Sequence, residues 1–216
     1  MDHKAPTPVH MEMRDRVGEK LFSPSAERNR SVIGKHLVGV LPKNAHVLEI
    51  ASGTGQHAAH VCGLRKDIKW QMSDIDAPSR QSQNAYAQDL PRQLPLSLTL
   101  DVTREKWWQD LGNTDVIYCA NMIHIAPWDA ALGLAKGGSI ILQNGGVLCL
   151  YGPFLTGETT ASSNLAFDRS LKARNSHWGV RNLDSVKHIF ADRGLNSCTV
   201  MDMPQNNLFL IFKTKI

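Results

Sequence analysis

The chain has 216 residues, of which 42% are hydrophobic and 20% charged, and its formal net charge is +4. These values suit one soluble globular domain and leave little room for a second core. The basic residues are spread along the chain without a stripe of stacking aromatics, which argues against a nucleic-acid partner. The first residues lack an apolar signal core and no window approaches the length of a membrane span, so we expect a cytoplasmic protein with no membrane partner.

The first elements expected along the chain are an arm and a helix. Residues 1–26 are mostly polar and contain prolines, so we expect an N-terminal arm or lid, followed by one domain over 27–216. Apolar residues recur at helical spacing over 27–41 and Pro42 ends the pattern, which predicts a helix.

Strands and helices alternate in the rest of the chain. Strands are expected at 45–50, 68–73, 96–100, 115–120 and 147–151, with helices at 56–64, at 79–88, around Trp107 and Trp108, and at 128–143. Residues 152–181 form a polar insert with a helix near 165–173, and we expect this insert to cover an acceptor pocket. A helix at 183–192 and strands at 195–201 and 207–213 follow. This alternation predicts an α/β fold with a doubly wound parallel sheet and helices on both faces.

A glycine-rich loop follows the first strand of this alternating region. The strand runs straight into Ala51-Ser52-Gly53-Thr54-Gly55, where glycines let the backbone turn sharply and approach a ligand closely. The segment from Gly53 to Ala58 also matches the dinucleotide pattern G-x-G-x-x-A, and Asp74 follows at about the expected distance. The loop alone therefore leaves NAD as a serious alternative.

The charge in front of the loop favours a different cofactor. A dinucleotide places its pyrophosphate on such a loop, where the carboxylate of Glu49 would repel it. S-adenosylmethionine (SAM) has no phosphate and carries an ammonium group and a sulfonium, both cationic. The acidic residue before the glycines therefore favours SAM over NAD.

Polar side chains also stand at the ends of the next three predicted strands. Asp74, Asp101 and Asn121 close the second, third and fourth strands. In an open α/β sheet the ligand binds at the carboxyl ends of the strands, so these residues and Glu49 face one crevice. Asp74 is suited to accept both ribose hydroxyls, and Asp76 is suited to cap the helix that follows.

Several motifs resemble those of one known family. They are Ser23–Asn29, Val47–His57, Asn121–Ile125, Tyr151–Phe154, Ser163–Asp168 and Trp178–Asn182. They resemble the methyltransferase-like proteins long grouped as a domain of unknown function, the group that contains methyltransferase-like protein 26. The resemblance implies a Rossmann-like class I methyltransferase fold, with a seven-stranded, mostly parallel sheet and an antiparallel last strand. It also implies SAM as the methyl donor and supplies no substrate.

The residues expected to bind the cofactor lie in the loop and at the strand ends. They are Glu49, Ala51, Ser52, Gly53, Gly55, His57, Asp74, Ile75, Asp101, Val102 and Asn121. Ala51 departs from the glycine that many relatives have at this turn. We expect the alanine to be tolerated there.

The acceptor side needs alignment of donor and acceptor, and a base wherever the acceptor carries a proton. The candidate catalytic residues are His124, Tyr151 and Asp168, although an ordinary wall role stays open for each. The expected pocket residues are Arg28, Asn29, Asn164, Trp178 and Arg181. His57 and His60 are one helical turn apart without a third ligand nearby, so we expect no metal site.

The sequence thus predicts a SAM-dependent methyltransferase that transfers a methyl group to an O, N or S atom of an unidentified small molecule. An NAD(P)-dependent oxidoreductase is one alternative, opposed by Glu49 and by the lack of a Tyr-x-x-x-Lys dyad. A non-enzymatic SAM-binding or interaction protein is another. We expect a small-molecule acceptor as the partner and leave a homodimer open.

Overall fold

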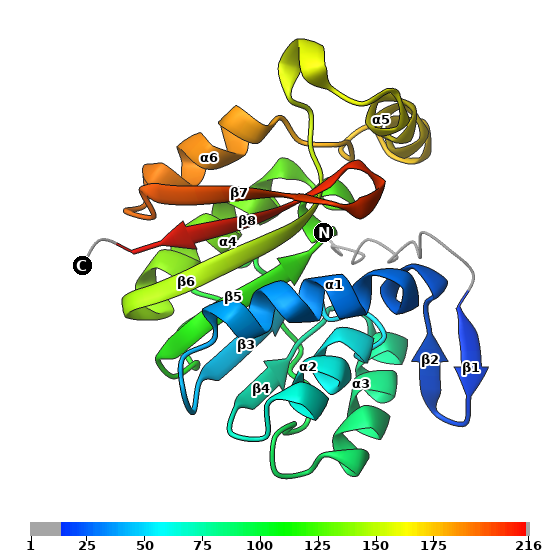
Figure 1. Cartoon of the computed structure of the whole chain (residues 1–216), viewed down its shortest axis with the longest axis vertical. Helices are drawn as coiled ribbons and strands as arrows, with labels where there is room; N and C mark the ends of the chain where they lie inside the picture. The colour runs from blue at the N-terminus through cyan, green and yellow to red at the C-terminus, as the bar shows by residue number, and fades with distance from the viewer. Residues whose placement is uncertain (1–13, 215–216) are drawn as a thin grey trace, which may run out of the picture.

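The structure is a computed structural model that describes residues 14–214. The strands of its central sheet are β3 (His46–Ile50), β4 (Lys69–Met72), β5 (Thr114–Ala120), β6 (Leu142–Pro153), β7 (Ser197–Met203) and β8 (Asn207–Lys213). They lie in the order β4-β3-β5-β6-β8-β7 (Figure 1). The first four are parallel and β8 is antiparallel to both of its neighbours, which confirms the antiparallel last strand.

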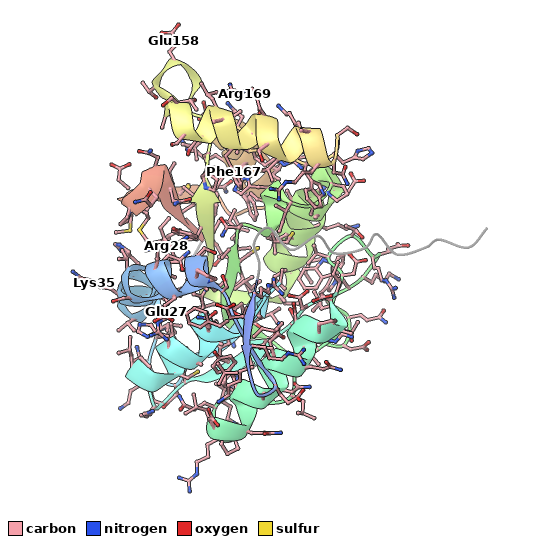
Figure 2. All side chains as sticks on the ribbon, turned by 90° about the vertical axis from the view of Figure 1, so that its right-hand side faces the viewer. Glu27, Arg28, Lys35, Glu158, Phe167 and Arg169 are labelled. Atoms are coloured by element: carbon pink, nitrogen blue, oxygen red, sulfur yellow. The ribbon has the colours of Figure 1, made fainter. Side chains whose placement is uncertain are left out.

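Helices cover both faces of this sheet because strand residues alternate between two apolar cores. They are α1 (Pro24–Val40), α2 (Gln56–Leu64), α3 (Ala77–Asp89), α4 (Trp128–Ile141), α5 (Ser162–Arg174) and α6 (Leu183–Ala191). Val47 packs with residues of α1, α2 and α3, and Leu48 packs with residues of α4 and α6. The predicted α/β fold is confirmed, and α5 stands apart above α1 (Figure 2). Within residues 14–214, no helix combines the length and apolar character needed to cross a membrane.

The sheet has six strands, so the seventh strand predicted at 96–100 was wrong. Only Leu98 pairs with the end of β4, through an isolated bridge to Ser73. The neighbouring backbone groups bond to side chains instead of a ladder. Gln71 donates to the Leu96 carbonyl, and the Ser97 amide donates to Asn84. These contacts use the groups that a continuous strand would need.

The short helix predicted around Trp107 and Trp108 was also wrong, because residues 102–110 form turns and a bend. Trp107 is held by packing on α4 rather than by helical periodicity. Its ring nitrogen donates to the Gly133 carbonyl at 3.0 Å. A Cβ at Gly137 would lie 2.3 Å from its ring, so the glycine makes room for it.

The N-terminal region contains a hairpin that the sequence did not reveal. Its strands are β1 (Asp15–Val17) and β2 (Lys20–Phe22), and they turn at Gly18, whose φ is +59°. The Leu21 amide donates to Ser82 Oγ on α3, which fastens the hairpin to the domain. Helix α1 already begins at Pro24, where Ser23 accepts from the Ala26 amide. Helix α1 thus starts three residues before the predicted helix at 27, and residues 1–13 of the predicted arm lie outside the described part.

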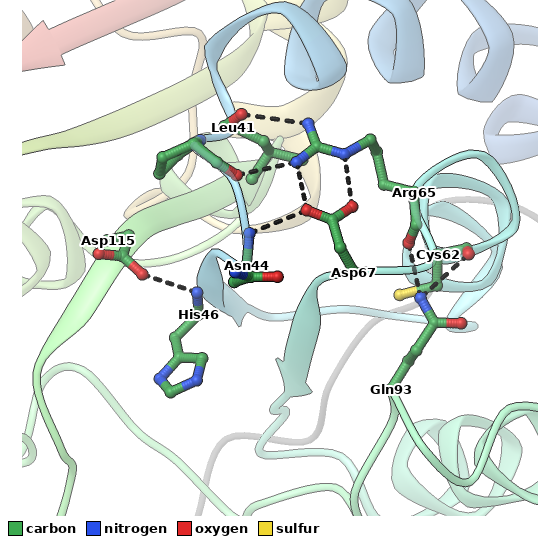
Figure 3. Close-up of polar contacts among 9 residues, drawn as sticks. Leu41, Asn44, His46, Cys62, Arg65, Asp67, Gln93 and Asp115 are labelled. Carbon is green, nitrogen blue, oxygen red and sulfur yellow. Dashed lines mark hydrogen bonds and ion pairs between the residues drawn. The ribbon is translucent and has the colours of Figure 1, made fainter.

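A polar cluster joins the connections at the amino ends of the parallel strands (Figure 3). Arg65, which follows α2, donates to the Leu41 and Pro42 carbonyls after α1 and forms two bonds with Asp67. The Asn44 amide donates to the same carboxylate at 2.8 Å. These bonds satisfy carbonyls that a helix end leaves without intrahelical partners.

Candidate active site

A cavity of about 510 Å³ lies at the carboxyl ends of β3, β5 and β6. The start of α1, the start of α5 and the turn between β7 and β8 close it from the other sides. Its walls contain ten of the residues expected from the sequence: Glu49, Ala51, Ser52, Gly53, His57 and Asn121 from the cofactor set, His124 and Tyr151 from the catalytic set, and Asn29 and Asn164 from the pocket set. A single half-open cavity therefore lies at the edge of the sheet where the sequence predicts a crevice.

The glycine loop turns through three residues with positive φ. Ala51, Gly53 and Gly55 have φ values of +55°, +58° and +91°. A Cβ at Gly55 would lie 3.3 Å from Gln83 Cα, so α3 approaches the loop too closely for a side chain there. Ala51 occupies a conformation that favours glycine, which costs about 1 kcal/mol. The loop therefore holds backbone strain in the wall of the cavity.

Glu49 places a carboxyl group in the wall beside this loop. The side chain is buried, and one of its oxygens accepts from Trp70 Nε1 at 2.9 Å. Burial raises the pKa of Glu49 to about 8, and hydrogen bonds from Trp70 and Ser52 only partly offset this. The group is therefore mostly protonated at pH 7 unless a cation lies next to it.

Asp74 supports the loop from the end of β4. Its carboxylate accepts from the Gly53 amide at 2.9 Å and from the Asp76 amide at 3.0 Å. Asp76 caps α3 by accepting from the Ser79 amide, as the sequence predicted. Burial raises the pKa of Asp74, and Arg14 is the cationic group that opposes this rise.

A chain of hydrogen bonds connects four elements along one wall. His57 Nε2 lies 2.8 Å from Asn29 Oδ1, which can only accept, so Nε2 carries the proton. His57 Nδ1 then accepts from the Tyr118 hydroxyl at 3.3 Å. Burial lowers the pKa of His57 to about 4 and raises that of Tyr151, although a side-chain hydrogen bond with Asn29 opposes the rise for Tyr151. The amide of Asn29 is thereby left to donate to Tyr151.

His124 follows β5 in a short 3₁₀ turn and faces the same cavity. Its Nδ1 accepts from the Arg181 amide at 3.2 Å, which assigns the proton to Nε2. Burial, followed by the charge of Arg181, lowers the pKa of His124 to about 3, although a backbone hydrogen bond with Gly179 opposes this shift. Among the described residues, Nε2 of His124 is the one buried side-chain nitrogen or oxygen without a hydrogen-bond partner. The expected role as a base does not fit a nitrogen that already carries its proton.

Asp168, Trp178 and Arg181 do not line the cavity. Asp168 accepts from the Val180 amide at 2.9 Å and pairs with Lys172, so it ties α5 to the segment behind it. Arg181 donates to the carbonyls of Ile123, Ala126 and His177, and Trp178 packs in a small apolar cluster. These three residues support the wall that holds His124.

Five of the expected cofactor residues, Gly55, Asp74, Ile75, Asp101 and Val102, also lie outside the walls, although Asp74 is one hydrogen bond from Gly53. Ile75 is 47% exposed, and Val102 belongs to the apolar core. Asp101 accepts from the amide and hydroxyl of Thr103 in its own turn. Arg28 lines a smaller neighbouring cavity of about 150 Å³, together with Tyr151 and Met203.

Several wall residues were missed by the sequence analysis. They are Arg14, Ser23, Ser25, Ala26, Thr54, Ala120, Ile125, Pro153, Ser163, Phe167, Gln205 and Asn207. Thr54, Ala120 and Pro153 adjoin predicted strand ends, and that position is a signal that could have found them. Gln205 and Asn207 reach the cavity only because β8 pairs with β6, where Asn207 lies opposite Pro153. Within residues 14–214, no group of three or more His, Cys, Asp or Glu side chains is placed to hold a metal ion.

The sequence matches a known family over almost its whole length. A model of the family described as "Protein of unknown function (DUF938)" matches residues 20–214. The chain belongs to this family. Membership in the narrower group that contains methyltransferase-like protein 26 stays a prediction.

The fold is similar to that of solved methyltransferase structures. An O-methyltransferase family protein from Burkholderia thailandensis has a TM-score of 0.78 at 15% identity, over 88% of this chain and 56% of that one. A putative O-methyltransferase from Nostoc punctiforme has a TM-score of 0.75 at 15% identity, over 88% and 57% of the chains. Human N-acetylserotonin methyltransferase in complex with SAM has a TM-score of 0.71 at 12% identity, over 89% and 53%. The chain spans little more than half the length of each, and at these identities the likeness shows the fold.

Proposed function

We propose that this chain is a SAM-dependent methyltransferase that acts on a small molecule. The observation that carries the proposal is the buried carboxyl of Glu49 in the cavity wall, directly before the glycine loop. A cavity of about 510 Å³ is in the usual range for small-molecule sites, roughly 300–1,000 Å³. The three similar structures carry methyltransferase names, which supports the same reaction class here.

The raised pKa of Glu49 changes how the charge argument works. Without a cation the carboxyl is mostly protonated at pH 7, so it would repel a pyrophosphate only weakly. An ammonium group beside Glu49 favours the ionised form, because the opposite charge offsets the burial of the carboxylate. Binding of SAM at pH 7 should therefore release about one proton from Glu49, whereas NAD supplies no such cation.

The residues present fit SAM. Residues 51–55 would carry the methionyl part, Glu49 would pair with its ammonium group, and Asp74 would meet the ribose from the end of β4. When bound, SAM supplies a methyl group on a positively charged sulfur, which is open to in-line displacement. The chain's own contribution is to align the acceptor with that methyl group and to exclude water.

Calorimetry with SAM, S-adenosylhomocysteine and NAD tests this proposal. We expect SAM and S-adenosylhomocysteine to bind, and two buffers of different ionisation enthalpy to report about one proton released at pH 7. Glu49→Gln should weaken binding at least about tenfold and abolish the proton release. Glu158→Gln, at an exposed site distant from the cavity, is the control and should bind like the wild type.

Two results would overturn the proposal. Tight NAD binding without SAM binding would identify an oxidoreductase instead. A protein that binds SAM but transfers no isotopically labelled methyl group into broad metabolite extracts would be a non-enzymatic SAM-binding protein.

A further inference from the structure

The unpartnered N–H of His124 indicates what the cavity binds besides a cofactor. Buried side-chain donors in native proteins nearly always have a partner, so an orphan that faces a cavity points to a ligand group. The tautomer follows from the Arg181 amide, which donates to Nδ1 at 3.2 Å. The ring of Phe154 packs edge to face against the imidazole, with centroids 5.1 Å apart, and holds its orientation. His124 therefore presents a fixed hydrogen-bond donor.

Gly152 packs closely against the edge of the imidazole that carries this donor. A Cβ at Gly152 would lie 2.7 Å from His124 Nε2 and 3.1 Å from Asn121 Oδ1. The φ of Gly152 is not positive, so its backbone conformation does not require glycine. The missing side chain therefore matters because a Cβ there would displace the imidazole that carries Nε2.

Tyr151 offers a second donor to the same cavity. The chain from Tyr118 through His57 to Asn29 leaves the Asn29 amide to donate to the Tyr151 oxygen. The hydroxyl proton of Tyr151 then remains to be donated to a ligand. Two neutral hydrogen-bond donors, the Nε2–H of His124 and the hydroxyl of Tyr151, therefore face the cavity from different elements.

The described walls offer no good acceptor for a substrate proton. The titratable or charged groups around His124 and the cavity are Arg14, Glu49 on β3, His57 on α2, Tyr151 on β6, and Arg181 behind the imidazole. Arg14 and Arg181 are cations, both nitrogens of His57 are engaged, and Tyr151 keeps its proton. Glu49 is bonded to Trp70 at the cofactor loop, where the proposed function assigns it to the ammonium group. These walls therefore suit a methyl acceptor that has already lost its proton to solvent when it binds.

On the basis of the proposed function, we propose that the methyl acceptor is a phenol or enol that binds as its oxyanion, with the Nε2–H of His124 holding that oxygen. A buried anion needs donors, and a buried donor needs an acceptor, so each satisfies the other. His124 then acts as a donor that selects and orients the oxyanion. In the transfer step a lone pair of this oxygen forms the new O–CH₃ bond. The S–CH₃ bond breaks with its electron pair staying on sulfur, so both charges are neutralised and no proton moves.

Binding of 4-nitrophenol, whose ionised form absorbs visible light, tests this inference without methyl transfer. The dye is titrated with pH in the presence of S-adenosylhomocysteine and saturating protein. We expect the wild type to lower the pKa of the bound dye by about one unit, because a donor to a charged oxygen stabilises it by that order. His124→Gln, which keeps an N–H donor without a titrating ring, should retain the shift, and His124→Leu should lose it.

Several outcomes separate this inference from the proposed function. Equal dye shifts in the Gln and Leu variants, or a dye that stays neutral or unbound in the wild type, would overturn the oxyanion inference alone. Failure of S-adenosylhomocysteine to bind would overturn the proposed function instead. If either variant fails to fold, ¹⁵N NMR of the wild type decides: we expect Nε2 of His124 to stay protonated from pH 5 to pH 9, and a proton on Nδ1 would contradict the inference.

Discussion

The two ends of the parallel strands differ in whether their polar groups find hydrogen-bond partners within the chain. At the amino ends, Arg65, Asp67 and Asn44 satisfy one another and the carbonyls after α1. At the carboxyl ends, Glu49 and His124 are buried in a cavity wall with pKa values shifted toward their neutral forms. A polar group that only supports the fold finds its partners within the chain. A buried group left short of partners marks the end of the sheet where a ligand binds.

Backbone strain also differs between the amino and carboxyl ends of the parallel strands. Ala51, Asn121 and Gln205 have positive φ and line the cavity, whereas Asn44 is the residue of this kind in the amino-end cluster. Asparagine adopts this conformation at low cost, but alanine does not. The strained alanine at the carboxyl ends therefore adds to the signs of a functional site there.

The largest expected effect comes from placing a side chain against His124. Gly152→Ala places a Cβ 2.7 Å from Nε2, so the imidazole must move or the acceptor is excluded. We expect methyl transfer to fall on the order of 100-fold while S-adenosylhomocysteine affinity stays within about twofold. Labelled-methyl assays and calorimetry measure the two effects.

Gly63→Ala is the matched control for this change. Gly63 lies in α2, and a Cβ added there would have nothing within 4 Å, so activity should stay at the wild-type level. Unchanged turnover in Gly152→Ala would show that methyl transfer does not depend on the position of the His124 imidazole.

The next effect concerns Glu49 and the stability of the ligand-free protein. Its pKa is raised from 4.5 to about 8 by folding, so the folded state holds a proton that the unfolded state releases between these values. The contribution of Glu49 to the free energy of unfolding is therefore greatest below pH 4.5 and is lost as pH rises through 8. The loss reaches roughly 3 kcal/mol at pH 7. Glu49→Gln should remove this loss, and urea unfolding of both proteins at pH 5 and pH 8.5 measures it.

Only the difference between the two proteins is informative in that comparison. Folding lowers the pKa of His57 to about 4 and that of His124 to about 3, so both proteins also gain stability as pH rises from about 3 to 6.5. Parallel pH profiles for the wild type and Glu49→Gln would contradict a raised pKa at Glu49.

The smallest effect is expected at the amino ends. Arg65→Ala removes the contacts to Asp67 and to two carbonyls, and we expect the Tm to fall by about 2–4 °C with SAM affinity unchanged. Hydrogen bonding from Arg65 lowers the pKa of Asp67, so the stabilisation is present at neutral pH and is lost as Asp67 becomes protonated in acid. Thermal unfolding at pH 7 and pH 3 checks both points.

Arg104→Ala is the control for this variant, because its side chain is 82% exposed and its contact to Asp101 is 3.9 Å long. Its Tm should match the wild type. A loss of SAM affinity in Arg65→Ala would show that the two ends of the sheet are coupled.

The main elements were predictable from the sequence because their apolar patterns are strong and local. The strands around Val47, Val116 and Leu148 bury alternate residues on two faces. The segments of Leu98 and Trp107 were misassigned because long-range contacts hold them, to β4 and α3 for Leu98 and its neighbours and to α4 for Trp107. Such contacts leave no period in the sequence.

The candidate site also has a part that local sequence patterns predict and a part that long-range contacts decide. By itself the sequence determined that Glu49, the glycine loop and Asn121 meet at one edge, because parallel strands bring their carboxyl ends together. Only the tertiary structure decided the chemistry of the acceptor side. Arg181 lies 57 residues from His124 yet sets its tautomer, and Asp168 and Trp178 turned away from the cavity to support that wall. Protonation and orientation depend on burial and on partners distant in the chain, and no local pattern of residues encodes them.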